Sequence, residues 1–432
     1  MALSKRPYKG TRDFFPELKR GQDFLFQKMS QTAHLFGYEP YDGPLLEEVD
    51  LYRAKSGEEL INDQIYSFID RGERHVAIRP EMTPTVARMV AQIHREVTRP
   101  IRWFTIANLM RYERPQKGRL REHWQFNCDI FGAPEGQGEV EILQVAIALL
   151  NNFGANEKHF EIRLNDRKIV DYTFNQLLKI DDEKALKLYK IVDRATKVSK
   201  EALDKMIDEL GLSDEQRKIF SDYLSLNSFG DLMQFLAGSE VATYLPKFVD
   251  QMEELGYLPY LKYDPTIVRG LDYYTGMVFE IFDKHPENRR ALCGGGAFAD
   301  LLKIFDETPL AGVGLGLGDV TLMDFLKVHN LLPSFERPSN DLFVSFQTEE
   351  AKIPALKLAK ELRSNNLNVI TTLEPLKFKK IFPAAEKKGA RFVAIFGDKE
   401  LENNSVQFKN MQTKEQTELS LSDIDKIVEY LK

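Results

Sequence analysis

A run of eleven residues, RYERPQKGRLR at 111–121, concentrates positive charge. It holds five cationic side chains and a single acid, Glu113. Arginine guanidiniums bind phosphate oxygens in pairs, so several of them on one hairpin suit a polyphosphate. By itself the run is also compatible with a solvated basic loop.

Arg269, Asp272, Tyr273 and Tyr274 form a second polar cluster, in VRGLDYYTG at 268–276. Neighbouring residues of a strand point to opposite faces. We therefore expect one tyrosine at most in the core and the other at a site. The alternative is an ion pair between Arg269 and Asp272 on an edge strand.

Glycine alternates with aliphatic residues in GVGLGLG at 312–318, and a second glycine cluster stands at 294–296. Glycine weakens a strand, so such a run often marks the close approach of a ligand or of another backbone. The run is not a dinucleotide-binding fingerprint, because Leu317 stands where the third glycine would fall and no helix-opening turn is predicted after it.

Glu81 and Thr83 lie in RPEMTPT at 79–85, at a predicted junction of strand and helix. Thr83 is a candidate N-cap before Pro84 at the first helical position. Capping accounts for the threonine but gives no reason for Glu81, which is therefore a candidate site residue.

A predictable series of elements must position these residues. Apolar periodicity predicts helices over 17–36 and about 137–152, and β-prone segments at 101–107 and 124–131 predict two antiparallel strands joined by the basic loop. Dense mixed-charge sequence from about 170 to 250 predicts a helical insertion. After a proline-containing linker at 331–340, alternating strand and helix signals predict a small α/β domain with a largely parallel sheet.

The composition is that of an ordinary soluble protein, with 432 residues, a net charge of −7 and 43% hydrophobic residues. The sequence has no apolar stretch of membrane-spanning length and no signal-peptide core, so we expect a cytoplasmic location. The two cysteines lack metal-ligand spacing, which predicts no zinc site. The acidic balance argues against non-specific coating of nucleic acid but leaves a local basic site open.

In order and content, the motifs resemble class II aminoacyl-tRNA synthetases, and among them the histidyl-tRNA synthetase family. The most specific match is RGLDYYTG at 269–276, which is similar to a signature of that family. RYERPQKGR at 111–119 resembles the class II motif 2 loop, and GYEPYDGPLLE at 37–47 resembles motif 1. Residues 392–411 resemble the end of the family's anticodon-binding domain.

The resemblance implies an α+β catalytic domain over 1–330, built on an antiparallel sheet and interrupted by the helical insertion, and an anticodon-binding α/β domain over 341–432. It implies a homodimer through motif 1. It also implies that ATP, with Mg²⁺, activates L-histidine to the adenylate and that the histidyl group then passes to the 3′ end of tRNA(His). Preorganised cations would supply most of the catalysis, and no general base is needed because a carboxylate is already a nucleophile.

By the same resemblance, Arg111 and Arg269 lie at the α-phosphate, with Arg269 as the catalytic cation. Glu113 meets the adenine, and Arg119 and Arg121 meet the outer phosphates. The implied histidine site consists of three residues at the ammonium group and three around the imidazole, namely Glu81, Thr83 and Gln125, then Asp129, Tyr273 and Tyr274.

Three positions depart from the family pattern. Asp319 occupies the place of a motif 3 arginine that contacts the terminal phosphate. This leaves open a magnesium-linked role for Asp319, or compensation by Arg119 and Arg121. GGGAFA at 294–299 lacks the usual Arg, Tyr and Asp of its segment, and Asp129 replaces a longer glutamate.

These departures keep a second interpretation open. A synthetase-like regulatory subunit of ATP phosphoribosyltransferase binds histidine without charging tRNA. Such subunits typically lack the anticodon-binding domain, whereas α/β sequence follows the linker here. A synthetase for another amino acid is disfavoured, because RGLDYYTG is a histidine-family feature.

Overall fold

The computed structural model describes residues 3–54, 60–195, 198–268, 273–288, 290–335 and 340–432. They form two compact units, Met1–Pro333 and Ser334–Lys432. Each unit has a hydrophobic core of its own. None of the described helices is both long and apolar enough to cross a membrane.

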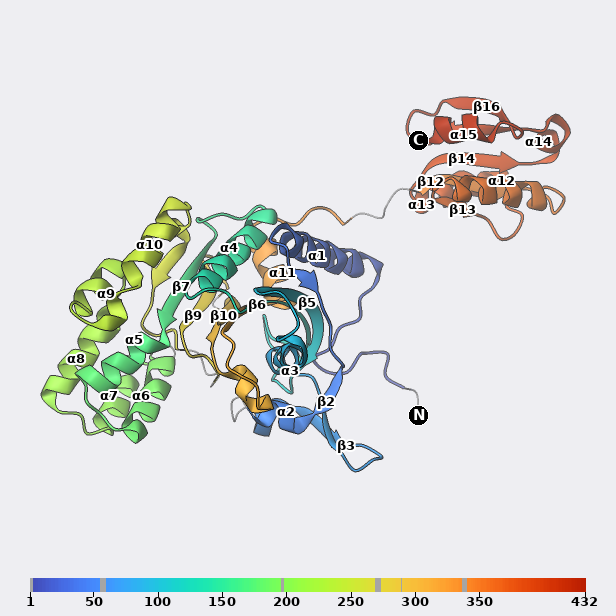
Figure 1. The fold of residues 1–432 in the computed structure, drawn as a ribbon. Coiled ribbons are helices and arrows are strands. Elements are labelled where there is room, and N and C mark those ends of the chain that lie inside the picture. The colour runs from blue at the N-terminus through green and yellow to red at the C-terminus, as the bar shows by residue number, and fades with distance from the viewer. Residues whose placement is uncertain (1–2, 55–59, 196–197, 269–272, 289, 336–339) are drawn as a thin grey trace. The chain divides into compact units, whose positions relative to one another are not determined.

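A mixed sheet forms the centre of the first unit, with eight strands among the described residues in the order β1-β5-β6-β11-β10-β9-β7-β8 (Figure 1). The six inner strands pair antiparallel, and the edge strands β1 and β8 pair parallel with β5 and β7. The predicted α+β catalytic fold on an antiparallel sheet is thereby confirmed. The strands are β1 (Glu39–Pro40), β5 (Ile101–Met110), β6 (Glu122–Phe131), β7 (Phe160–Asp166), β8 (Leu261–Tyr263), β9 (Met277–Asp283), β10 (Ala291–Phe298) and β11 (Gly312–Gly318).

Strands β5 and β6 are the antiparallel pair that the sequence predicts, and each is longer than expected. Their register joins Ile101 to Phe131 at one end and Met110 to Glu122 at the other. Strand β6 is two-faced because side chains alternate along it. Its apolar face enters the core, whereas its polar face carries His123, Gln125, Asn127 and Asp129.

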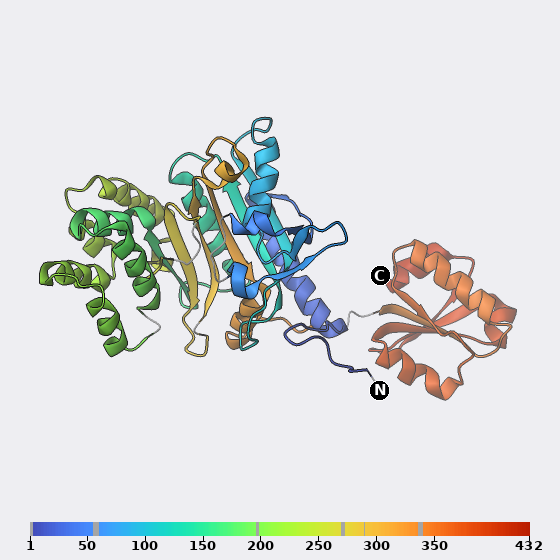
Figure 2. The ribbon, with the colours of Figure 1, turned by 90° about the horizontal axis from the view of Figure 1, so that it is seen from below.

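Three helices, α1 (Pro16–Leu35), α4 (Gln137–Asn152) and α11 (Asp319–Val328), pack on one face of the sheet and close the main core (Figures 1 and 2). The first two match the predicted helices within a few residues. Helix α11 begins directly after β11, so the expectation that no helix opens after the glycine run is wrong. The opposite face of the sheet is left for the site.

A smaller sheet, β2-β4-β3, is formed by residues that precede Glu81 in the chain. Its strands pair antiparallel throughout. Strand β4 leads directly into α3, which places residues 79–83 at the junction of the two elements. The elements are β2 (Leu46–Glu48), α2 (Val49–Arg53), a π-helical turn (Leu60–Gln64), β3 (Tyr66–Ile69), β4 (His75–Ile78), α3 (Thr83–Ile93) and a short 3-10 helix (Leu301–Phe305).

A helical lobe follows β7 (Figure 2). It has its own apolar cluster, which includes Phe174, Leu188, Phe220 and Tyr223. Asp and Ser side chains cap five of its helices by accepting backbone N–H groups. Its elements are α5 (Arg167–Tyr172), a π-helical turn (Thr173–Leu177), α6 (Asp182–Arg194), α7 (Lys200–Asp208), α8 (Asp214–Ser225), α9 (Phe229–Phe235), α10 (Leu245–Glu254) and two 3-10 turns (Glu240–Ala242 and Leu258–Tyr260).

The second unit holds a sheet in the order β13-β12-β14-β15-β16. The first three strands are parallel as predicted, but β15 and β16 pair antiparallel. The segment between β15 and β16 is too short for the crossover that a parallel pair requires. The elements are β12 (Asn340–Phe346), α12 (Lys352–Ser364), β13 (Val369–Thr371), α13 (Phe378–Lys387), β14 (Ala390–Phe396), α14 (Asp398–Asn403), β15 (Ser405–Asn410), β16 (Gln416–Ser420) and α15 (Ile424–Leu431).

Candidate active site

Glycines of β10 and β11 lie under the candidate site, on the face of the sheet opposite α1, α4 and α11. Gly314 of β11 pairs with Asp129 of β6 on one side and with a glycine of β10 on the other. A Cβ on Gly314 would stand 2.1 Å from Asp129 Oδ1, and a Cβ on Gly316 would stand 2.6 Å from Gln125 Nε2. The glycines therefore make room for the polar side chains of β6, which gives the alternating run a structural reason.

All six residues predicted for the amino acid line one cavity of about 410 Å³, which we call the inner cavity. It lies above β6, β10 and β11, against the start of α3 and the segment that precedes β9. The six are Glu81, Thr83, Gln125, Asp129, Tyr273 and Tyr274, and Arg111 and Arg119 line the same cavity. The fold thus brings together residues that are almost 200 positions apart in the chain.

Glu81 is buried and held in a polar environment. The Tyr273 hydroxyl donates to Glu81 Oε2 at 3.3 Å and lies 3.5 Å from Thr83 Oγ1. The backbone before Glu81 is fixed by Arg79, which donates to Asp42 Oδ1 at 2.7 Å and to two backbone carbonyl oxygens. A buried carboxylate fixed in this way is suited to bind a cationic group such as an ammonium.

Two local predictions at the inner cavity are wrong. Thr83 is the first residue of α3 rather than its N-cap, which is Met82, and no side-chain capping bond forms there. Tyr273 and Tyr274 are both buried, with ring centroids 4.7 Å apart, and both line the cavity. Strand alternation does not separate them, because β9 begins only at Met277.

Asp129 has an unusual environment for a carboxyl group. Burial raises the pKa of Asp129 to about 8, because the ionised form loses its contact with water. An imidazole has an unperturbed pKa of roughly 6.5 and carries both a donor and an acceptor when neutral. A carboxyl group that titrates near neutrality is therefore able to share a proton with such a ring.

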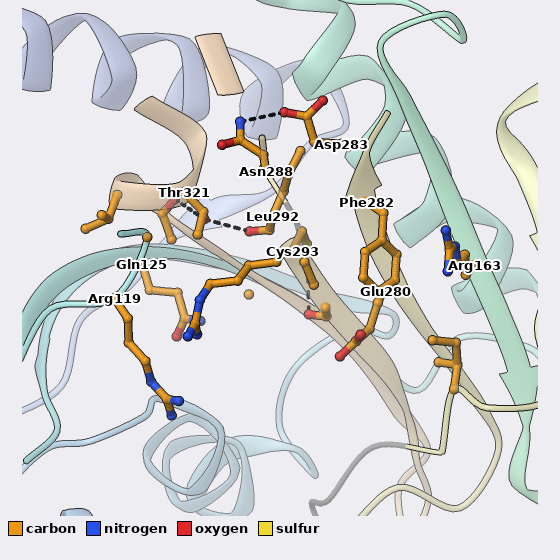
Figure 3. A pocket seen from close by; sticks show the side chains of 18 of the residues that line it. Arg119, Gln125, Arg163, Glu280, Phe282, Asp283, Asn288, Leu292, Cys293 and Thr321 are labelled. Atoms are coloured by element: carbon orange, nitrogen blue, oxygen red, sulfur yellow. Dashed lines mark hydrogen bonds between the residues drawn. The ribbon is translucent and has the colours of Figure 1, made fainter. Parts of the chain in front are cut away.

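A second cavity, of about 930 Å³, adjoins the first and is called the outer cavity (Figure 3). It shares Arg111, Arg119 and Gln125 with the inner cavity. Figure 3 shows Gln125 and Glu280 on opposite sides of the space, with Phe282 above Glu280 on β9. The shared residues mark the place where a group in one cavity meets a group in the other.

The basic loop contributes three charged residues to the outer cavity. Arg119 forms an ion pair with Glu113, with Nη2 at 2.5 Å from Oε1. Arg111 donates from Nε to the carbonyl oxygen of Pro80 at 2.9 Å, which ties the loop to the segment that carries Glu81. Part of the basic run therefore forms a cavity wall, whereas Arg114 and Lys117 of the same run are exposed.

Arg121 is placed elsewhere and lines neither cavity. Its guanidinium carbon lies 4.0 Å from the Tyr112 ring centroid, and Nη1 donates to the Tyr8 hydroxyl at 2.7 Å. Its backbone N–H donates to the carbonyl oxygen of Gly10 at 2.9 Å. Arg121 holds the N-terminal segment against the loop, so the predicted contact with the outer phosphates has no support in the fold.

Asp319, like Arg121, makes contacts with other parts of the protein. It is buried, and its Oδ2 accepts from Arg12 Nη2 at 2.7 Å while Oδ1 accepts from the backbone N–H of Trp124 at 3.0 Å. Both carboxylate oxygens are thus engaged by the protein, and Asp319 lines neither cavity. The magnesium-linked role that the sequence leaves open for Asp319 is not favoured.

The predicted catalytic cation, Arg269, lies outside the described residues, as does Asp272. The described part of that segment begins at Tyr273, on the wall of the inner cavity. The role of Arg269 stays a prediction.

Further polar residues line the cavities and were missed by sequence analysis, among them His123, Asn127, Asp193, Glu280 and Arg290. The alternation of β6 could have identified His123 and Asn127, because they share a face with Gln125. Burial lowers the pKa of His123 to about 3, helped by the arginines nearby, so its ring is neutral at physiological pH. Asp193 comes from α6 of the helical lobe, and no local sequence signal points to it.

Two family models together match most of the chain. The model described as histidyl-tRNA synthetase matches residues 10–320, and that described as anticodon binding domain matches residues 341–431. A histidine--tRNA ligase of Leptospira biflexa serovar Patoc is 41% identical over 432 residues, which cover 99% of this chain and 98% of that protein.

Solved structures share the fold over most of the chain. A histidyl-tRNA synthetase from Nostoc sp. PCC 7120 has a TM-score of 0.78 at 23% identity, covering 99% of this chain and all of that one. A Bacillus halodurans protein described as an ATP phosphoribosyltransferase regulatory subunit/histidyl-tRNA synthetase has a TM-score of 0.76 at 21% identity, covering 92% of this chain and all of that one. These two likenesses concern the fold alone. On the evidence of the two family models and the full-length relative, the chain belongs to the histidyl-tRNA synthetase family.

Proposed function

We propose that the chain is a histidine–tRNA ligase, which activates L-histidine with ATP and transfers it to tRNA(His). The observation that carries the proposal is the pair of adjoining cavities, one polar and the other lined with arginines, which share Arg111 and Gln125. Full-length similarity to proteins named as histidine--tRNA ligases supports it, and the match to an anticodon-binding domain disfavours the regulatory-subunit interpretation.

In this proposal the inner cavity binds histidine. Glu81, supported by the Tyr273 hydroxyl, accepts hydrogen bonds from the ammonium group, together with Thr83 and Gln125. Asp129 shares a proton with the imidazole, and Tyr274 packs beside the ring. The carboxylate of histidine then points toward the residues that both cavities share.

The outer cavity receives ATP. Arg111 contacts the α-phosphate together with Arg269, and Glu113 contacts the adenine. Arg119 contacts an outer phosphate, for which it turns away from Glu113, its ion-pair partner. The neutral ring of His123 adds an uncharged surface to the same cavity, near Arg111 and Arg119.

The first reaction joins the contents of the two cavities. A carboxylate oxygen of histidine forms a bond to the α-phosphorus while the bond from that phosphorus to the departing pyrophosphate breaks. Negative charge builds up on the α-phosphoryl oxygens and on pyrophosphate, where fixed guanidiniums stabilise it. A terminal hydroxyl of tRNA then attacks the carbonyl carbon of the adenylate and releases AMP.

Mg²⁺ is part of the proposal as a companion of ATP. Among the described residues, no group of three or more His, Cys, Asp and Glu side chains is placed to hold a metal ion. A Mg²⁺ ion that arrives on phosphates needs only one or two protein carboxylates, and Glu280 lines both cavities. When bound, the ion neutralises charge on the phosphates.

We also propose a cytoplasmic homodimer. The β2-β4-β3 region exposes the large apolar side chains of Leu45, Leu46, Phe68 and Ile69, and exposed apolar surface is often found at interfaces. Leu45 and Leu46 lie within the segment that resembles motif 1, and Phe68 and Ile69 lie on β3 of the same sheet. Sedimentation of the full chain should give the mass of two copies, and a monomer at micromolar concentration would contradict the proposal.

The experiment that tests the function is ATP–pyrophosphate exchange with each of the twenty amino acids. We expect exchange with histidine alone, followed by transfer of labelled histidine to tRNA. Exchange with another amino acid would contradict the substrate assignment. Histidine binding without any exchange would instead support a regulatory role.

A further inference from the structure

Arg290 is an arginine of the outer cavity that no motif accounts for. It lies between β9 and β10 and shares the cavity wall with Arg111 and Arg119. Within the ranges that the structure describes, no side chain or carbonyl group forms a hydrogen bond or ion pair with it. An arginine on a cavity wall without such a partner is free to bind a ligand.

The side chain of Arg290 is exposed and lies close to the basic loop. Gly118 of that loop has φ of +72°, and a Cβ there would stand 3.3 Å from Arg290 Cδ and 3.6 Å from Thr321 Cγ2. The same two loops are joined by Lys117 Nζ, which lies 3.6 Å from Glu287 Oε2. The side chain of Arg290 therefore passes close to Gly118, and both line the outer cavity together with Thr321 of α11.

The charges around Arg290 favour an anion. Burial lowers the pKa of Arg290, and the like charge of Arg119 lowers it further. Glu113 is the nearby carboxylate that offsets this effect, but it is already the ion-pair partner of Arg119. Arg290 therefore lies beside a second guanidinium and close to a carboxylate that already has an ion-pair partner, and a phosphate group would give Arg290 an anionic partner of its own.

Helix α11 supplies no cation at this place. Its first residue, Asp319, is buried and paired with Arg12, and the residues of α11 that reach the outer cavity are Val320 and Thr321. The cation on this side of the cavity therefore comes from the hairpin of β9 and β10.

We propose that Arg290 binds the outer phosphates of ATP and does the work of the arginine that motif 3 lacks in this chain. The proposal rests on the proposed function of the outer cavity as the ATP site. It adds a nucleotide-binding residue that lies outside every motif of the sequence. Because Arg290 contacts only the phosphates beyond the first, it discriminates ATP from AMP.

The test measures the binding of ATP with Mg²⁺, and of AMP, by calorimetry in the full chain. The variants are Arg290→Ala and Arg290→Met, and the second keeps much of the side chain that passes Gly118. We expect ATP affinity to fall roughly 10- to 100-fold, as for the loss of a hydrogen bond to a charged group, and AMP affinity to stay within about twofold. Arg290→Lys should recover part of the loss. Lys327→Ala, which removes an exposed cation from α11, is the matched control and should bind ATP normally.

Unchanged ATP affinity in both Arg290 variants would overturn the proposal. An equal loss for ATP and AMP would also overturn it, because Arg290 would then act on the nucleoside or on the fold. If the unmodified chain failed to bind ATP at all, the proposed function itself would fall. These results are distinguishable from one another in a single series of titrations.

Discussion

Asp129 shows how a single residue can combine recognition with a cost to stability. It stands on the polar face of β6, is 4% exposed, and has room only because Gly314 faces it. The alternation of β6 explains its direction, and its burial explains its raised pKa. Ionising the buried Asp129 carboxyl group costs free energy. In our account this cost is offset because the carboxyl group shares a proton with the imidazole of histidine.

The pKa of Asp129 predicts how stability depends on pH. Burial raises that pKa from 3.8 to about 8, so between these values the folded chain binds a proton that the unfolded chain has released. The stability from this carboxyl group is therefore fully present below about pH 4 and is lost as pH rises toward 8. We expect Asp129→Asn to show a smaller fall in Tm from pH 5 to pH 8 than the unmodified chain. Parallel pH profiles of the two proteins would contradict the raised pKa.

Gly314 predicts a second effect at the residue scale. A Cβ at this position would stand 2.1 Å from Asp129 Oδ1, so Gly314→Ala must displace the Asp129 side chain. We expect the KM for histidine in pyrophosphate exchange to rise by about tenfold or more, which corresponds to about 1.4 kcal/mol. The matched control is Gly318→Ala on the same strand, whose Cβ would meet Thr321 Oγ1 at an ordinary 3.6 Å. A normal KM for histidine in Gly314→Ala would show that Asp129 does not contact the substrate.

At the scale of elements, the sequence predicts β5, β6, α1 and α4 because each has a clear periodicity. The site residues are less predictable where tertiary contacts, rather than a periodic sequence pattern, determine their positions. Tyr273 and Tyr274 precede β9 and escape strand alternation, while Thr83 enters α3 instead of capping it. Arg121 and Asp319 looked like ligand residues, yet both bind the N-terminal segment. Such pairings join residues distant in the chain and leave no local pattern.

The pairing of Arg12 with Asp319 predicts how the N-terminal segment is held. Asp319 is 3% exposed, so Arg12→Ala leaves a buried carboxylate without its cation. We expect the free energy of unfolding of the first unit to fall by about 1–3 kcal/mol. The double variant Arg12→Ala with Asp319→Asn should lose less than the sum of the two single variants, because the two residues interact. Additive losses would show that the contact contributes nothing.

At the scale of the whole molecule, composition and linker signals predict two parts, and the structure divides the chain at Pro333. The mixed-charge helical sequence likewise predicts the helical lobe. What the sequence does not predict is that α6 of this lobe brings Asp193 to the walls of both cavities. That placement depends on how the lobe packs on the sheet, which no segment encodes by itself.

The division into two units predicts that the first unit forms the adenylate and that the second contributes to tRNA recognition. A chain that ends at residue 335 keeps both cavities and the core of the first unit, because all of their described residues precede Pro333. We expect its rate of histidine-dependent pyrophosphate exchange to stay within about threefold of normal, and its tRNA charging to fall by at least tenfold, as about 1.4 kcal/mol of lost tRNA contact would produce. Equal losses in both assays would mean that the second unit supports the catalytic unit rather than tRNA recognition.

The central claim is that histidine occupies the inner cavity, ATP the outer one, and that the two react where the cavities share Arg111. The most direct measurement is a crystal structure of the chain with a non-hydrolysable analogue of histidyl-adenylate. Our account predicts the imidazole within hydrogen-bonding distance of Asp129, the ammonium group at Glu81, and the α-phosphate mimic beside Arg111. An analogue bound with its imidazole in the outer cavity, or away from both cavities, would contradict the account.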